Sequence, residues 1–169
     1  SAAAIAEGAF YNAGQSCCAV ERVYVDRRIY APFLDALAEE AKAWTAGDPL
    51  AEATKLGPMA KPGAPGAALE QVDEAVAAGG RLLAGGRPCS VGGRGRYFEA
   101  TVLADTDHSM RVMTEESFAP IAAVSAVGGD EEAVTLMNDS RYGLTASLWT
   151  ADEAAAEAIG RRLEVGTVL

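Results

Sequence analysis

The fold class is decided by a strand-like run, Arg22-Val23-Tyr24-Val25-Asp26, and by the segment Tyr30–Trp44 that follows it. The second segment has its apolar side chains at helical spacing, so that one face carries Phe33, Leu34, Leu37, Ala38 and Ala41. Gly47-Asp48-Pro49 then ends this helix. A strand followed by a helix is the unit from which α/β proteins are built.

The rest of the chain repeats this alternation. Further strands are predicted at Arg81–Ala84, Tyr97–Leu103, Ile121–Val127, Ala146–Trp149 and Val165–Leu169. Further helices are predicted at Ser1–Tyr11, at Ala67–Ala78, at Glu131–Met137 with Asp130 as cap, and from the capping box Thr150–Glu153 to Leu163. Gly85–Gly95 holds five glycines and is typical of a turn region. We therefore expect an α/β domain with a largely parallel sheet flanked by helices.

Both ends of the sequence have the pattern of interrupted elements. Ser1–Tyr11 resembles the back part of a helix, and the chain stops inside the strand predicted at Val165–Leu169. A lone terminal strand leaves its neighbours unpaired. We expect residues 1–169 to be a single domain that is truncated at both ends.

The composition excludes several classes of partner. The chain has 169 residues, of which 50% are hydrophobic, and its 14 basic and 24 acidic residues give a net charge of −10. A nucleic-acid or anionic membrane surface needs clustered positive charge, so we expect neither partner. Gly92-Gly93-Arg94-Gly95-Arg96 then reads as a hairpin turn at the surface. No apolar stretch is long enough to span a bilayer, and no leader peptide is evident.

Three cysteines, Cys17, Cys18 and Cys89, cannot all form disulfides, and two of them are sequence neighbours. A reducing, intracellular setting fits this pattern, so we expect a cytoplasmic protein. Together with His108 the cysteines match no metal-binding spacing, and we expect no metal site. Asp105-Thr106-Asp107 lacks further ligands and reads as a loop.

The segment Phe10–Ala19 carries the first chemically informative pattern. Gly14 allows a sharp turn, and Cys17 follows it closely. A cysteine in this position can offer one substrate atom both a thiolate and its own backbone N–H, which are the nucleophile and the oxyanion donor that acyl chemistry requires. From spacing alone, the commoner fate of Cys17 and Cys18 as small buried hydrophobes stays open.

Three motifs resemble those of the aldehyde dehydrogenase superfamily. Asn12-Ala13-Gly14-Gln15-Ser16-Cys17 is similar to its Gly-Gln-x-Cys signature, and the matched nucleophile is Cys17, not Cys18. Glu115-Glu116-Ser117-Phe118-Ala119-Pro120 is similar to Glu-Glu-x-Phe-Gly-Pro, with Ala119 where glycine is usual. Asn138–Ala146 is similar to Asn-x-x-x-Tyr-Gly-Leu-x-Ala. The matches cover essentially the whole chain in the expected order.

The resemblance implies an enzyme that oxidises a small-molecule aldehyde to a carboxylic acid with NAD or NADP. Cys17 would form a thiohemiacetal and then a thioester, with its backbone N–H helping to hold the oxyanion. Glu116 would bind the hydroxyls of the nicotinamide-side ribose, and Phe118 would pack beside the nicotinamide end of the cofactor. Taken without its motif, Glu116 would read as a solvated loop carboxylate.

The resemblance also implies what this chain lacks. In the family, the general-base glutamate, the oxyanion-hole asparagine and the dinucleotide-binding domain precede this segment, and a segment that aids oligomerisation follows it. We therefore expect the dinucleotide-binding domain to be absent, the chain alone to be inactive and the full-length enzyme to be a homo-oligomer. Two alternatives are an acylating relative that uses coenzyme A and a non-catalytic protein that retains the fold. The intact Gly14–Cys17 segment and Glu116 argue against the second alternative.

Overall fold

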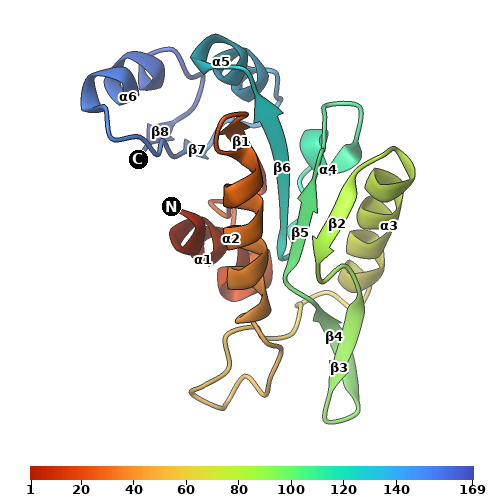
Figure 1. Ribbon diagram of the computed structural model, residues 1–169. Coiled ribbons are helices and arrows are strands. Elements are labelled where there is room, and N and C mark those ends of the chain that lie inside the picture. Colours follow the sequence, from red (N-terminus) through yellow and green to blue (C-terminus); the bar gives the residue numbers. More distant parts are fainter.

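The computed structural model describes residues 1–169 and has a four-stranded sheet at its centre (Figure 1). The strand order is β1 (Arg22–Asp26), β6 (Ile121–Val127), β5 (Thr101–Ala104) and β2 (Arg81–Ala84). Both β1 and β5 run parallel to β6, whereas β2 pairs with β5 in the antiparallel direction. The predicted α/β class with a largely parallel sheet is thus confirmed.

Helices cover both faces of this sheet (Figure 1). One face is covered by α1 (Ala2–Phe10), the 3₁₀ turn η1 (Tyr11–Gly14) and α2 (Tyr30–Lys42), and the other by α3 (Ala64–Ala77) and α4 (Arg111–Thr114). The last two helices, α5 (Asp130–Asn138) and α6 (Glu153–Gly160), lie at one end of the molecule, near the carboxyl end of β6. The sheet has a hydrophobic cluster on each face, and β6 contributes to both, because alternate side chains of a strand point to opposite faces. Ala122 and Val124 pack with α1 and α2, while Ile121 and Ala123 pack with α3 and α4.

The strand predicted at Tyr97–Leu103 is wrong as a single element. Its first residues belong to β4 (Arg94–Phe98), which forms a hairpin with β3 (Pro88–Val91), and its last residues belong to β5. The hydroxyl of Thr101 donates to the carbonyl of Glu99 and accepts from the N–H of Gly86, so the chain turns between the two strands. The predicted turn region at Gly85–Gly95 therefore contains a strand, and only its Gly92-Gly93 tip and the Gly85-Gly86 pair have consecutive left-handed glycines.

Element ends differ from the predictions where local hydrogen bonds decide them. Helix α3 begins at Ala64 rather than Ala67, because Pro65 fits the first helical turn, where its missing N–H costs nothing. The N-cap of α6 is Asp152, whose carboxylate accepts from the N–H of Ala155 at 3.0 Å, and not Thr150. Asp130 lies inside α5, whose cap is Gly129. The strand predicted at Ala146–Trp149 is mostly wrong, since only Ala146 lies in β7 (Thr145–Ala146). The strand predicted at Val165–Leu169 shortens to β8 (Thr167–Val168), which pairs with β7 in parallel.

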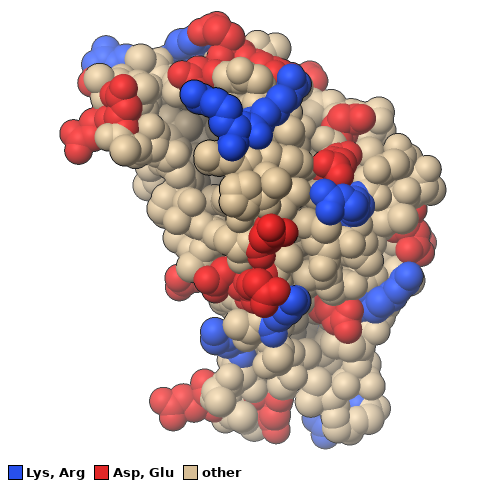
Figure 2. Space-filling view, viewed as in Figure 1, with Lys and Arg blue, Asp and Glu red and all other residues tan.

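The surface carries charges of both signs. On the face shown in Figure 2, acidic side chains predominate and basic ones are interspersed among them. None of the helices has both the length and the apolar character needed to cross a membrane.

Candidate active site

Two loops that are far apart in sequence meet at one edge of the sheet. The cysteine loop (residues 11–20) leads to β1, and the glutamate loop (residues 115–120) leads directly into β6. Because β1 and β6 are parallel neighbours, the loops that precede them lie at the same edge. Residues of both loops, among them Cys17 and Glu116, line one groove with a volume of about 720 Å³.

The backbone of the cysteine loop is unusual. Asn12, Ala13 and Gly14 have φ values of +52°, +56° and +71°, so three successive residues adopt left-handed conformations. For a non-glycine residue this costs roughly 1–2 kcal/mol, so the surrounding contacts must hold the turn in place. Gly14 is the glycine of the chain with the least room for a side chain, since an added Cβ would lie 2.1 Å from the carbonyl oxygen of Ala119. The turn therefore packs directly on the glutamate loop.

Side chains fasten the turn that precedes Cys17. The amide of Gln15 donates to the carbonyl of Asn12 at 3.0 Å and accepts from the N–H of Ala60 at 2.7 Å, which joins the loop to residues 58–60. The hydroxyl of Tyr11 donates to the hydroxyl of Ser16. These bonds involve residues on the N-terminal side of Cys17 and leave its thiol exposed.

The two neighbouring cysteines differ in their hydrogen bonds. The backbone N–H of Cys18 donates to the hydroxyl of Ser16 at 3.3 Å, whereas the N–H of Cys17 has no acceptor within the chain. The two sulfur atoms lie 3.9 Å apart. The hydrogen bond with Cys17 raises the pKa of the Cys18 thiol above its usual value, and desolvation and the charge of Cys17 add to this. The pKa of the Cys18 thiol is thus raised, and Cys17 is the cysteine whose backbone N–H is free to donate.

Side chains also hold the glutamate loop, residue by residue. The N–H of Glu116 donates to the hydroxyl of Tyr142 at 3.3 Å. The N–H groups of Ser117 and Phe118 donate to the two carboxylate oxygens of Glu21, at 2.8 and 2.9 Å. The carboxylate of Glu116 forms no hydrogen bond or ion pair within the chain and is exposed. Its two oxygens are therefore available to a ligand in the groove.

Phe118 has a left-handed backbone with φ +49°, and its side chain is 41% exposed. A large apolar side chain in a strained and exposed position is an unusual feature of a loop. Its backbone N–H is bonded to Glu21, and the residue is not among those that line the groove of Cys17 and Glu116.

The sequence reasoning missed two residues of this site. Glu21 carries no motif, and its partner Ser117 lies 96 positions away, so only the folded chain reveals the contact. Tyr142 lies in the third motif, whose local pattern indicates only a helix end and a turn. Burial raises the pKa of the Glu21 carboxyl, while the bonds from Ser117 and Phe118 oppose that rise and the charge of Glu116 reinforces it.

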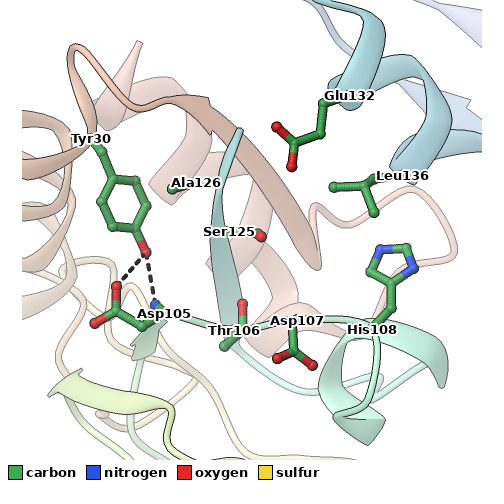
Figure 3. Close-up of a pocket in the computed structure, with 9 residues that line it drawn as sticks. All are labelled: Tyr30, Asp105, Thr106, Asp107, His108, Ser125, Ala126, Glu132 and Leu136. Carbon is green, nitrogen blue, oxygen red and sulfur yellow. Dashed lines mark hydrogen bonds between the residues drawn. The ribbon is translucent and has the colours of Figure 1, made fainter. Parts of the chain in front are cut away.

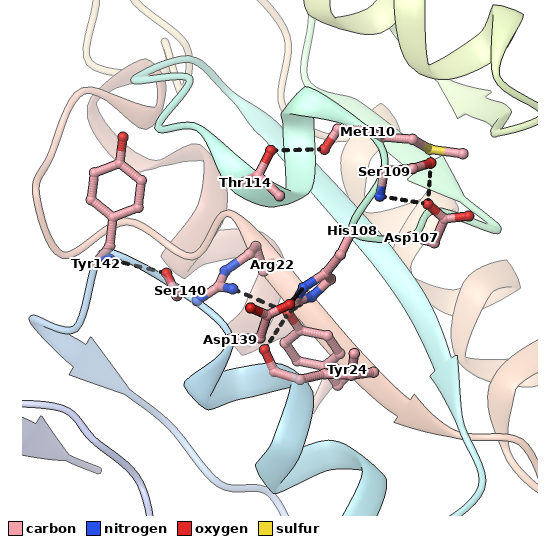
Figure 4. A network of polar contacts seen from close by, with 11 residues as sticks. Arg22, Tyr24, Asp107, His108, Ser109, Met110, Thr114, Asp139, Ser140 and Tyr142 are labelled. Atoms are coloured by element: carbon pink, nitrogen blue, oxygen red, sulfur yellow. Dashed lines mark hydrogen bonds and ion pairs between the residues drawn. The ribbon is translucent and has the colours of Figure 1, made fainter.

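His108, for which the sequence indicates no role, lies in a polar network (Figure 4). Its Nδ1 lies 2.7 Å from the carboxylate of Asp139, and its Nε2 lies 2.8 Å from the hydroxyl of Tyr24. Arg22 donates to the same hydroxyl at 3.2 Å. The network ties β1, the segment after β5 and the end of α5 together, which is a structural role.

A second pocket, of about 380 Å³, lies beyond the carboxyl ends of β5 and β6 (Figure 3). Its lining comprises Tyr30, Asp105, Thr106, Asp107, His108, Ser125, Ala126, Glu132 and Leu136. The hydroxyl of Tyr30 accepts from the N–H of Asp105 at 2.7 Å and holds the start of this segment. No three potential metal ligands converge here or elsewhere in the chain. No motif residue lines this pocket, so the groove with Cys17 is the candidate active site.

Comparison with known proteins identifies the family of the chain. The model of the aldehyde dehydrogenase family matches residues 1–169. The chain belongs to this family. It is 39% identical over 162 residues to betaine aldehyde dehydrogenase 1 of Rhizobium meliloti, covering 95% of this chain and 33% of that protein. It is also 39% identical over 161 residues to the succinate semialdehyde dehydrogenase [NAD(P)+] Sad of Escherichia coli, covering 95% of this chain and 34% of that protein.

Solved structures of the family have the same fold. The aldehyde dehydrogenase KauB from Pseudomonas aeruginosa superimposes with a TM-score of 0.95 at 32% identity, covering 99% of this chain and 34% of that one. Betaine aldehyde dehydrogenase from Staphylococcus aureus, solved in complex with NAD+, gives a TM-score of 0.91 at 31% identity, covering 97% and 33%. This chain spans about a third of the length of the aldehyde dehydrogenases it matches.

Proposed function

We propose that this chain is the part of an NAD- or NADP-dependent aldehyde dehydrogenase that carries the nucleophile, Cys17. The observation that supports this most directly is the pairing of an exposed thiol with a backbone N–H that has no acceptor in the chain, in one groove with Glu116. The residues that complete the reaction, including the dinucleotide-binding domain, the general base and a second oxyanion donor, would come from outside residues 1–169. The substrate is a small-molecule aldehyde.

The first step belongs to Cys17. Its thiolate attacks the aldehyde carbon, a C–S bond forms, and the carbonyl oxygen becomes an oxyanion. The backbone N–H of Cys17 donates to this oxyanion, because no acceptor within the chain competes for it. The product is a thiohemiacetal on Cys17.

The residues of the glutamate loop fit a dinucleotide. A carboxylate accepts two hydrogen bonds, which matches the two adjacent hydroxyls of a ribose, and the oxygens of Glu116 have no partner in the chain. Bound NAD or NADP supplies the hydride acceptor for the thiohemiacetal carbon. Glu116 would orient the ribose, and the exposed ring of Phe118 would pack beside the nicotinamide end. Loss of the hydride converts the thiohemiacetal to a thioester on Cys17.

Water completes the cycle by attacking the thioester carbon. The C–S bond breaks, the water supplies the hydroxyl of the carboxylic acid and the proton of the departing sulfur, and the thiol of Cys17 is regenerated. Because this cycle needs a free thiol, we also assign the enzyme to the reducing cytoplasm, and we expect the full-length protein to be a homo-oligomer.

The test is a pair of cysteine variants in the full-length enzyme. Cys17→Ala removes the nucleophile, so it should abolish production of reduced cofactor from an aldehyde panel with NAD and NADP. Cys18→Ala is the matched control, because it removes a neighbouring exposed thiol and should retain most of the activity. Full activity in Cys17→Ala, or loss of activity only in Cys18→Ala, would overturn the assignment.

A further inference from the structure

The carboxylate of Glu21 connects the two loops of the site. The backbone of Glu21 is part of the sheet, since its carbonyl accepts from the N–H of Ala123 in β6 at 2.9 Å. Its side chain reaches the glutamate loop, where its two oxygens accept separately from Ser117 and Phe118. One residue therefore ties the loop to the strand that the cysteine loop enters.

Among the N–H groups of residues 116–119, those of Glu116 and Ala119 form longer bonds to neutral acceptors. The ends of the loop are held separately, since Glu115 pairs with Arg111 at 3.1 Å and the carbonyl of Pro120 accepts from the N–H of Thr101 at 2.9 Å. The N–H of Glu116 has a single neutral acceptor at 3.3 Å, the hydroxyl of the exposed Tyr142. The N–H of Ala119 bonds within the loop, to the hydroxyl of Ser117 at 3.3 Å. Glu21 instead offers a charged acceptor to two consecutive donors at 2.8 and 2.9 Å, and charge-assisted bonds are roughly twice as strong as neutral ones.

Placing a carboxylate in this position has an electrostatic cost. Glu21 is half-buried, and both this burial and the charge of Glu116 raise the pKa of its carboxyl. A neutral side chain would fill the same space at a lower cost of desolvation. The carboxylate suits two backbone N–H groups that have no other acceptor, and these belong to the two residues that follow Glu116.

We propose that Glu21 is a positioning residue of the dehydrogenase, which sets the orientation of Glu116 and Phe118 toward the cofactor through the backbone between them. The proposal rests on the function proposed above. Without the two hydrogen bonds to Glu21, the N–H groups of Ser117 and Phe118 have no acceptor, while the ends of the loop stay held by the ion pair of Glu115 with Arg111 and by the packing of Ala119 on Gly14. Glu116 then samples several orientations, and the ribose must order the loop as it binds. Cys17 lies in the other loop, so its reactivity should not depend on the hydrogen bonds from Ser117 and Phe118 to Glu21.

The test is Glu21→Gln in the full-length enzyme, with Glu52→Gln as control because Glu52 is exposed and forms no hydrogen bond or ion pair. A glutamine keeps the size of the side chain but turns its NH₂ group toward one of the two backbone donors. We expect the Kd of the cofactor, titrated without aldehyde, to rise about tenfold. The rate of alkylation of Cys17 and the KM of the aldehyde should stay within about twofold of their original values.

A second variant, Glu21→Asp, keeps the charge but is one methylene shorter, and we expect a smaller rise of the cofactor Kd. A cofactor Kd that is unchanged in both variants would overturn the proposal. So would an equal worsening of cofactor binding, aldehyde KM and Cys17 alkylation together with a lower Tm, since that pattern indicates a purely structural role. If Cys17→Ala is inactive and Glu21→Gln is normal, only the role of Glu21 fails. If Cys17→Ala is active, the proposed function fails.

Discussion

Replacing Gly14 by alanine should separate the two loops of the site. Gly14 has φ +71°, and the added Cβ would lie 2.1 Å from the carbonyl oxygen and 2.7 Å from the nitrogen of the Ala119–Pro120 peptide. The left-handed backbone costs alanine about 1–2 kcal/mol. The overlap with a peptide that cannot rotate away adds about 1–3 kcal/mol more, as in overpacked cores. The free energy of unfolding should fall by about 2–5 kcal/mol in total.

Gly92→Ala provides the matched control. Gly92 is also left-handed, with φ +58°, but an added Cβ at this hairpin tip would meet no atom within 4 Å. In this variant the free energy of unfolding should fall only by the cost of a left-handed alanine, about 1–2 kcal/mol, and the activity should be fully retained. The difference between the two variants therefore isolates the contact between the loops.

The assay is urea unfolding of both variants, followed by kcat/KM and the cofactor Kd of the full-length enzyme. We expect Gly14→Ala to lose more stability than Gly92→Ala and to lose activity even where it is folded. Equal losses of stability in the two variants, with activity preserved in both, would refute the close packing of the cysteine loop on Ala119.

Three further outcomes are expected. Limited alkylation should modify Cys17 before Cys18 and Cys89, since the pKa of each of the latter two thiols is raised, and peptide mass mapping that found Cys89 modified first would contradict this. Glu116→Gln in the full-length enzyme should weaken cofactor binding and lower efficiency about tenfold, because a charged acceptor to a hydroxyl contributes about 1.5–3 kcal/mol, whereas unchanged constants would leave Glu116 a solvated carboxylate. The 169-residue chain alone should form an aldehyde adduct at Cys17 but produce no reduced cofactor, because the general base and the dinucleotide-binding domain are proposed to lie outside it. Sustained absorbance of reduced cofactor would disprove this.

Much of the sheet could be predicted from local sequence. Arg22–Asp26, Arg81–Ala84 and Ile121–Val127 have the predicted bounds, because each is a short apolar run with turn residues or charges at its ends. The break between Phe98 and Thr101 could not be predicted, since the apolar pattern continues through it. It depends on the bonds of the Thr101 hydroxyl to residues on both sides of the hairpin.

The site could be predicted only in part. The motifs name Cys17 and Glu116, but no spacing in the sequence reveals that β1 and β6 are neighbours, and this pairing brings the loops together. General experience with open α/β sheets places ligands at the carboxyl ends of the strands, which here would indicate the pocket beside Tyr30 and His108. Glu21 could not be found at all, because its importance arises from two backbone groups of a distant loop.

The parallel pairing of β1 with β6 also bears on the timing of catalysis. Five residue pairs hold the two strands in register, from Arg22 with Ala123 to Asp26 with Val127. The loops at their amino ends cannot slide apart along the strands unless that ladder of hydrogen bonds breaks. Cys17 and Glu116, the proposed nucleophile and ribose ligand, therefore lie in loops that enter two strands of fixed register. We expect a conformational gate in the proposed catalytic cycle to involve other movements, such as cofactor entry or product release.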